Sequence, residues 1–239
     1  LHLSIRRQRQ MCIRDSIISD EFASIPRDIF ETVVAGFAAV SADPIENVKR
    51  LAAEKRAAEL GVETPESIEE LNPDAVICSG SRANVSMWEP WMDDAAQVLQ
   101  QAVTANIPVL GICFGHQLLC KALGGEVKRT KVRTDIVSPL FSVGMDTLLS
   151  PIKTGLFTHQ DEVTRLPPGT RRIISTKHCE NAGMRVAGKP VWGVQFHPEA
   201  SRSVIEQAHA DGDMDDAEFA AFEAEHDGGA LLSAFAQLC

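Results

Sequence analysis

Residues 109–119, with the sequence VLGICFGHQLL, decide how the rest of the chain is interpreted. An apolar run over residues 107–112 ends at Cys113, and an apolar pattern with helical spacing follows it. Gly111 and Gly115 lie two residues before and two residues after this cysteine. Between a strand and a helix, such a pattern is typical of a nucleophile elbow, where a side chain at either flanking position would collide with neighbouring backbone.

In an elbow of this kind the sulfur of Cys113 is presented at the carboxyl end of a strand. The first N–H group of the following helix points at it, and the positive end of the helix dipole favours the thiolate. The alternative is a buried structural cysteine in an α/β sheet, and the local pattern alone leaves this alternative open.

The composition suits a globular protein. The 239 residues are 44% hydrophobic, which is enough for one large α/β domain or two small ones. No stretch reaches the roughly 18 uncharged apolar residues that a membrane-spanning helix needs. Six cysteines include no CxxC pair and no cysteine–histidine metal cluster, and no secretory signal is visible. We therefore expect reduced thiols in a cytoplasmic protein.

The first sixteen residues do not share the pattern of the rest of the chain. Residues 6–16, RRQRQMCIRDS, resemble an out-of-frame translation of a sequencing adaptor, so residues 1–16 are treated as non-native. The alternative is a basic arm or the start of a targeting peptide. On the first interpretation, the natural N-terminus with a first strand is missing or cut back to about Ile17, and residues 17–239 form one domain.

The charge distribution argues against nucleic acid as a direct partner. The net charge is −10, and residues 1–16 contribute +3 of it, so the remainder carries −13. Beyond Arg202 there is no lysine or arginine, whereas residues 206–227 contain nine acidic side chains. Such a chain does not attract phosphate backbones. We interpret the acidic run, within a helical C-terminus over 206–239, as a solvated face, with a docking surface for a basic partner as the alternative.

Strands and helices alternate along most of the chain, which predicts a single three-layer α/β/α domain with a central, mainly parallel sheet. From residue 126 to residue 176 the pattern changes to short β-rich pieces, which are broken by Pro139, Pro151, Pro167 and Pro168. Strands are expected over 74–78, 107–112, 181–187 and 190–196, and helices over 25–40, 44–60, 88–102, 115–123, 213–225 and 230–238.

A thiol nucleophile needs a base, and the base needs a group that fixes its tautomer. His197 and Glu199 follow the last expected strand and are two residues apart. In an extended segment, residues at this spacing lie on one side, so imidazole and carboxylate can meet, while Pro198 stiffens the segment. Together with Cys113 they make a candidate triad assembled by the fold.

Three stretches together resemble the class I (triad) glutamine amidotransferases. They are GICFGHQ at 111–117, WGVQFHPE at 192–199 and THQDEV at 158–163, which looks like the His-Gly-Asp-x-Val segment of that family. The resemblance covers about residues 70–205 and includes the glutaminase part of GMP synthase and free-standing relatives. It implies a flavodoxin-like fold.

The resemblance also implies roles for the matching residues. Cys113 would attack the side-chain amide of glutamine and form a γ-glutamyl thioester, with His197 as acid and base and Glu199 orienting it. The oxyanion would be bound by the N–H of Phe114 and one from the turn at Gly80 and Ser81. The α-amino-acid end would meet a further group of residues: Gln117 and the backbone of Thr158, His159, Gln160 and Asp161.

Departures from the family pattern affect some of these roles. A Gly-Gly-Pro-like loop is replaced by Ser79-Gly80-Ser81-Arg82. Gln160 replaces a glycine, which would either narrow the pocket or change its contacts. His116 and the side chain of His159 are interpreted as structural. No metal or organic cofactor is implied.

The sequence has no P-loop and no SGGxDS segment that would mark a synthetase. We therefore expect a glutaminase domain that releases ammonia for an unidentified acceptor, with glutamine as substrate and a separate synthetase subunit or acceptor enzyme as partner. One alternative is a γ-glutamyl hydrolase acting on γ-glutamyl amines or peptides. The second alternative is a non-catalytic relative that binds a ligand or partner.

Overall fold

The computed structural model describes residues 73–238 except 82, 211 and 213. The helices expected over 25–40 and 44–60, and the segment 1–16, lie outside the described residues. No helix in the described part of the chain is long and apolar enough to cross a bilayer.

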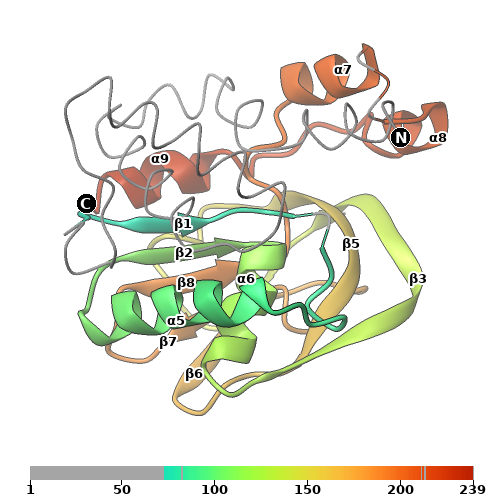
Figure 1. The fold of residues 1–239 in the computed structure, drawn as a ribbon. Coiled ribbons are helices and arrows are strands. Elements are labelled where there is room, and N and C mark those ends of the chain that lie inside the picture. Colours follow the sequence, from blue (N-terminus) through green and yellow to red (C-terminus); the bar gives the residue numbers. More distant parts are fainter. Residues whose placement is uncertain (1–72, 82, 211, 213, 239) are drawn as a thin grey trace, which may run out of the picture.

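A six-stranded sheet with strand order β1-β2-β8-β7-β6-β4 forms the centre of the fold (Figure 1). Strands β1, β2 and β8 are parallel, whereas β7, β6 and β4 continue the sheet in antiparallel pairing. The α/β class is therefore as predicted, and among the described strands the expected parallel order is found in the half built from β1, β2 and β8. The strand bounds are β1 Val76–Cys78, β2 Val109–Ile112, β4 Phe141–Ser142, β6 Thr170–Ser175, β7 Gly183–Val186 and β8 Val191–Val194.

Strands β2 and β8 are short, apolar and buried over their whole lengths, as expected of strands covered on both faces. Helices α5 (Trp91–Thr104) and α6 (Phe114–Ala122) cover one face, and α9 (Ala230–Ala236) covers the other (Figure 1). Successive side chains of a strand point to opposite faces, so Val109 packs with α5 and α6 while Leu110 packs on the other side. The three layers predicted from the sequence are present.

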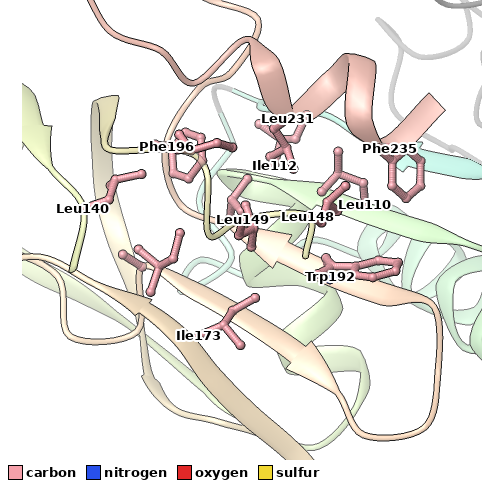
Figure 2. Packing of buried hydrophobic residues seen from close by; sticks show 14 of the residues in the cluster. Leu110, Ile112, Leu140, Leu148, Leu149, Ile173, Trp192, Phe196, Leu231 and Phe235 are labelled. Carbon is pink, nitrogen blue, oxygen red and sulfur yellow. The ribbon is translucent and has the colours of Figure 1, made fainter. Parts of the chain in front are cut away.

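The core on the α9 side is built mainly from residues far apart in the sequence. Figure 2 shows Leu110 and Ile112 of β2, Trp192 of β8 and Phe235 of α9 converging between the layers. The rings of Trp192 and Phe235 meet edge to face, with centroids 6.2 Å apart. This packing fixes the strands whose carboxyl ends carry the candidate triad.

A second sheet pairs two long strands, β3 (Glu126–Pro139) and β5 (Thr154–Arg165), in antiparallel register. The expectation of short pieces over 126–176 is wrong here. Pro139 occupies the last position of β3, where it interrupts no continuing ladder, and a register shift between Arg129 and Thr134 bends the strand without ending it. The segment 158–163 lies within β5.

The C-terminal region contains α7 (Arg202–Ala210), which the sequence did not predict, and α8 (Asp216–Ala221), which is shorter than the expected helix 213–225. Asp215 begins α8 with a capping box completed by Glu218. Asp227 accepts hydrogen bonds from the N–H groups of Lys153 and Thr154 at the start of β5. Several acidic side chains are exposed, but these three have structural partners.

Two glycines allow the strand β2 and the helix α6 to approach at the elbow. A Cβ placed on Gly111 would lie 2.6 Å from the carbonyl oxygen of Gly115. A Cβ on Gly115 would overlap the carbonyl oxygen of Cys78 in β1. The expected collision at both flanks of Cys113 is confirmed, because real Cβ atoms do not approach backbone this closely.

Replacing Gly115 with alanine is expected to destabilise the fold by about 3 kcal/mol or more, because the neighbouring backbone has to move. The matched control is Gly188→Ala, at a turn where φ is +70° and no atom lies within 4 Å of the added Cβ. It should lose only about 1–2 kcal/mol from its backbone conformation. Urea unfolding of both variants measures the difference; equal losses would contradict the packing argument.

Candidate active site

Cys113 lies between β2 and α6 in a backbone conformation that few residues other than glycine adopt, with φ +50° and ψ −102°. Its N–H donates to Val194 O of β8 (2.8 Å), and its carbonyl accepts from Gln117 N (3.1 Å) as the first bond of the helix. Strain of this kind, about 1–3 kcal/mol, persists only where surrounding structure holds it. Here the sheet holds one side of the residue and the helix holds the other.

His197 is positioned by the chain that leaves β8. Phe196 is fully buried against Phe157 of β5, with ring centroids 6.1 Å apart, and the N–H of His197 donates to Leu156 O at 2.7 Å. The spacing of His197 and Glu199 predicted an extended segment, but the chain turns here instead. Ala200 N donates to His197 O at 3.3 Å. Pro198 suits the second position of such a turn because its ring fixes φ.

The turn brings the carboxylate of Glu199 to the imidazole of His197. His197 Nδ1 donates to Glu199 Oε1 at 2.7 Å, which leaves Nε2 as the free nitrogen of the ring. Both side chains are largely buried, at 12% and 9% exposure. The predicted contact therefore forms, although across a turn rather than along a strand.

Electrostatics favour the protonated form of His197. Burial is the largest single influence and lowers the pKa of His197, but the Cys113 thiolate and the Glu199 carboxylate together outweigh it. The pKa of His197 therefore lies well above its ordinary value. His197 Nε2 is buried, and hydrogen bonding between the Cys113 side chain and the imidazole contributes to the raised pKa of His197. The arrangement can hold a proton on the imidazole next to a negatively charged sulfur.

The loop after β1 completes the close packing around the pair. A Cβ on Gly80 would lie 2.9 Å from His197 Cε1 and 3.9 Å from Cys113 Cβ, so the Gly80 backbone lies close to both residues. Ser81 is exposed, and its hydroxyl accepts from Ala83 N at 3.1 Å. Phe114 begins α6, and its N–H, as the first of a helix, has no acceptor within the helix. Of the three predicted oxyanion residues, Gly80 and Phe114 flank Cys113.

The sequence profile of the family named Glutamine amidotransferase class-I matches residues 45–214, more than half of the chain. The chain belongs to the class-I glutamine amidotransferase family. A GMP synthase [glutamine-hydrolyzing] from Clostridium novyi is 33% identical over 150 residues, which cover 59% of this chain and 27% of the relative. One subunit of the GMP synthase [glutamine-hydrolyzing] from Methanococcus aeolicus is 34% identical over 117 residues, covering 48% of this chain and 62% of that subunit.

The amidotransferase fold is also seen in solved structures. A glutamine amidotransferase from Thermotoga maritima superposes with a TM-score of 0.58 at 23% identity, over 76% of this chain and 88% of that one. A glutamine amido transferase from Methylobacillus flagellatus gives 0.55 at 22% identity, over 64% and 62%. This likeness supports the flavodoxin-like fold. The matched region is only about a quarter of the length of the Clostridium novyi GMP synthase and less than two thirds of the Methanococcus aeolicus protein.

The segment 158–161 of this amidotransferase domain has divided roles. The Thr158 carbonyl lies 3.8 Å from Cys113 Sγ and accepts from the thiol. The Gln160 side chain points away along the second sheet, where its Nε2 donates to Thr130 O at 2.7 Å. Asp161 is buried and accepts from the N–H (2.7 Å) and hydroxyl (2.8 Å) of Ser86. The Asp161 side chain thus anchors a loop, and substrate contact by this segment stays a prediction for its backbone.

His116 and His159 are buried and lie outside the candidate triad. His116 Nε2 contacts Asn181 O at 3.0 Å, and its ring packs against Gly193 of β8. His159 Nδ1 contacts Asp161 O at 3.0 Å. Burial lowers the pKa of each to about 4, so both are neutral at pH 7. These contacts agree with the structural roles inferred from the sequence. The described part of the chain contains no group of three or more His, Cys, Asp or Glu side chains that could hold a metal ion.

Sequence reasoning missed three polar residues close to the site. Gln195 is fully buried, and its Nε2 lies 3.5 Å from Cys113 Sγ. The Thr158 hydroxyl donates to Asp135 Oδ1 at 2.7 Å, and its oxygen accepts from Arg133 Nη2 at 2.6 Å. Gln195 sits inside the WGVQFHPE stretch, which marks it, whereas Arg133 and Asp135 reach the site only through the pairing of β3 with β5.

Replacing Glu199 with glutamine is expected to lower the pKa of His197, because the neutral amide no longer favours the imidazolium. The expected result is deprotonation of His197 at a lower pH, measured by NMR titration of the imidazole in selectively labelled protein. Glu206→Gln, which removes an exposed carboxylate paired with Arg202, is the matched control. A curve for His197 that is identical in wild type and Glu199→Gln would contradict the assigned contact.

Proposed function

We propose that this chain is a glutaminase domain that hydrolyses the side-chain amide of glutamine through a thioester on Cys113. The single observation that carries the proposal is the meeting of Cys113, His197 and Glu199 at the ends of two adjacent parallel strands. Membership of the class-I glutamine amidotransferase family supports it.

In the first half of the reaction, the Cys113 thiolate attacks the amide carbon of the glutamine side chain, and the carbonyl π electrons move onto oxygen. The N–H of Phe114 and one from the Gly80–Ser81 loop stabilise this oxyanion. A donor of this kind lowers the barrier by about 3–4 kcal/mol. The imidazolium of His197 protonates the departing nitrogen, and the C–N bond breaks. Ammonia is released, and the γ-glutamyl group remains on Cys113 as a thioester.

In the second half, the neutral imidazole of His197 removes a proton from water, which attacks the thioester carbonyl. The C–S bond breaks, glutamate leaves, and the thiolate–imidazolium pair is restored. Glu199 holds the ring through Nδ1 in both halves, so Nε2 always faces the reacting atoms. The raised pKa of His197 suits the first half, since the ring enters the cycle already protonated.

Gln117 restricts how the α-amino-acid end of glutamine binds. Its Nε2 already donates to Asp161 O (2.8 Å) and to Gln195 Oε1 (3.2 Å), which uses both of its N–H bonds. Only its carbonyl oxygen is left for a ligand. Gln117 would therefore accept from the α-ammonium group, and the backbone of 158–161 and neighbouring loops would meet the α-carboxylate.

The ammonia is proposed to be used by a synthetase site outside the described fold. The relatives from Clostridium novyi and Methanococcus aeolicus are GMP synthases, and in Methanococcus aeolicus the matching protein is one subunit of such an enzyme. These names support a synthetase, on a partner chain or elsewhere on the same polypeptide, as the acceptor of the ammonia.

Purified protein is expected to release ammonia and glutamate from glutamine, and Cys113→Ala should lower this rate by more than about 1,000-fold because no nucleophile remains. Cys120→Ala is the matched control: Cys120 lies on the same helix and is buried, but its thiol donates to Arg165 O instead. This variant should retain activity. Ammonia release is followed by a coupled enzymatic assay.

Two outcomes would point to the alternatives. Faster turnover of a γ-glutamyl amine or peptide than of glutamine would make the chain a γ-glutamyl hydrolase. Failure of diazo-oxo-norleucine, a glutamine-analogue electrophile, to label Cys113 in protein that is folded and carries its natural N-terminus would leave only a non-catalytic binding role.

A further inference from the structure

Gln195 lies outside the candidate triad, yet its side chain touches the nucleophile. It follows β8 directly, and its N–H donates to Ala182 O at 2.9 Å, so the backbone is held by the residue before β7. The side chain is 0% exposed, and its Nε2 lies 3.5 Å from Cys113 Sγ. A buried amide requires partners at both ends, and one of these partners is the reacting sulfur.

The direction of the amide is fixed by a second glutamine. Gln195 Oε1 accepts from Gln117 Nε2 at 3.2 Å, and the same nitrogen donates to Asp161 O at 2.8 Å. Since the Asp161 carbonyl can only accept, Gln117 must present its nitrogen here, and Gln195 must present its oxygen to Gln117. The NH₂ group of Gln195 therefore faces Cys113.

This contact distinguishes the two protonation states of the sulfur. In the neutral state the thiol donates to Thr158 O at 3.8 Å. After the proton has passed to His197, the thiolate faces the Thr158 carbonyl, which has no hydrogen to offer. Gln195 then supplies a charge-assisted N–H···S hydrogen bond to Cys113 Sγ. This bond matters because Cys113 is only 6% exposed. A buried charge is strongly disfavoured unless it is both paired and hydrogen-bonded, so the Gln195 donor adds to the pairing of the thiolate with the His197 imidazolium.

We propose that Gln195 is a positioning residue that stabilises the Cys113 thiolate and directs the sulfur toward the substrate, and that Gln117 holds Gln195 in this orientation. The proposal rests on the proposed function, because a thiolate nucleophile is what the glutaminase reaction needs. It adds a role for Gln117 besides its contact with substrate. Loss of the amide should therefore alter the nucleophile before any glutamine is bound.

The test is the pH dependence of Cys113 alkylation by iodoacetamide in the absence of glutamine, read by mass spectrometry of the Cys113 peptide. Gln195→Met keeps the unbranched length and removes the N–H donor. At a pH on the rising part of the wild-type profile, we expect it to react on the order of 10-fold more slowly, with the whole profile moved to higher pH. Gln195→Glu should move the profile further, because its carboxylate repels the thiolate.

Gln100→Met is the matched control, since it removes a side-chain amide from the surface of α5, where Nε2 donates to Ala122 O. Its alkylation profile should equal that of wild type. Gln195→Glu is nearly the same shape as wild type and tests the same point if Gln195→Met does not fold. A Gln195 variant that folds and keeps the wild-type alkylation profile would overturn the proposal, even if its turnover of glutamine fell.

The outcome is independent of the proposed function, because alkylation requires neither glutamine nor a partner. A shifted profile together with failure of diazo-oxo-norleucine to label Cys113 would support the role of Gln195 and refute the glutaminase assignment. An unchanged profile together with ammonia release would do the reverse.

Discussion

The parallel pairing of β2 with β8 is the constraint on which the candidate site depends. Gly111 is opposite Gly193 and Ile112 is opposite Val194, so the two strands end at the same edge of the sheet. The N–H of Cys113 extends this ladder by one more bond to Val194 O. Because the chain leaves β2 at Cys113 and leaves β8 toward His197, a nucleophile and a base far apart in the sequence meet without either strand bending. Residues buried on both faces, such as Leu110 and Val191, keep this register.

The residues around this edge of the sheet orient Cys113 and His197 for reaction. The positive φ of Cys113 and the two flanking glycines place the sulfur at the start of α6. On the other side, the buried ring of Phe196 and the bond from His197 N to Leu156 O join the central sheet to the second sheet. Both sheets therefore contribute to one site: the central sheet supplies Cys113 and His197, and β5 supplies the Thr158 carbonyl. A change in the packing of Phe196 would move the base relative to the nucleophile.

Local sequence patterns were sufficient to predict the features whose residues lie within a few positions of one another. The elbow was predictable because Gly111, Cys113 and Gly115 are neighbours, and the His197–Glu199 contact because only Pro198 separates them. The long ladder of β3 and β5, the donation from Ser86 to Asp161 and the approach of Arg133 to Thr158 were not predictable, because each depends on pairing between distant residues. The turn at Pro198 was missed for another reason: a strand was extended beyond Val194, where β8 ends. Gln195 was visible in the sequence, but only the fold shows which atom it faces.

The central claim is that Cys113 itself becomes acylated by glutamine. Wild-type protein mixed with isotopically labelled glutamine, quenched in acid within the first turnovers and digested, should carry the labelled γ-glutamyl group on the peptide that contains Cys113. The label should be released by hydroxylamine, as expected of a thioester. Label that is absent while glutamate accumulates, or that is found on another residue, would contradict the account.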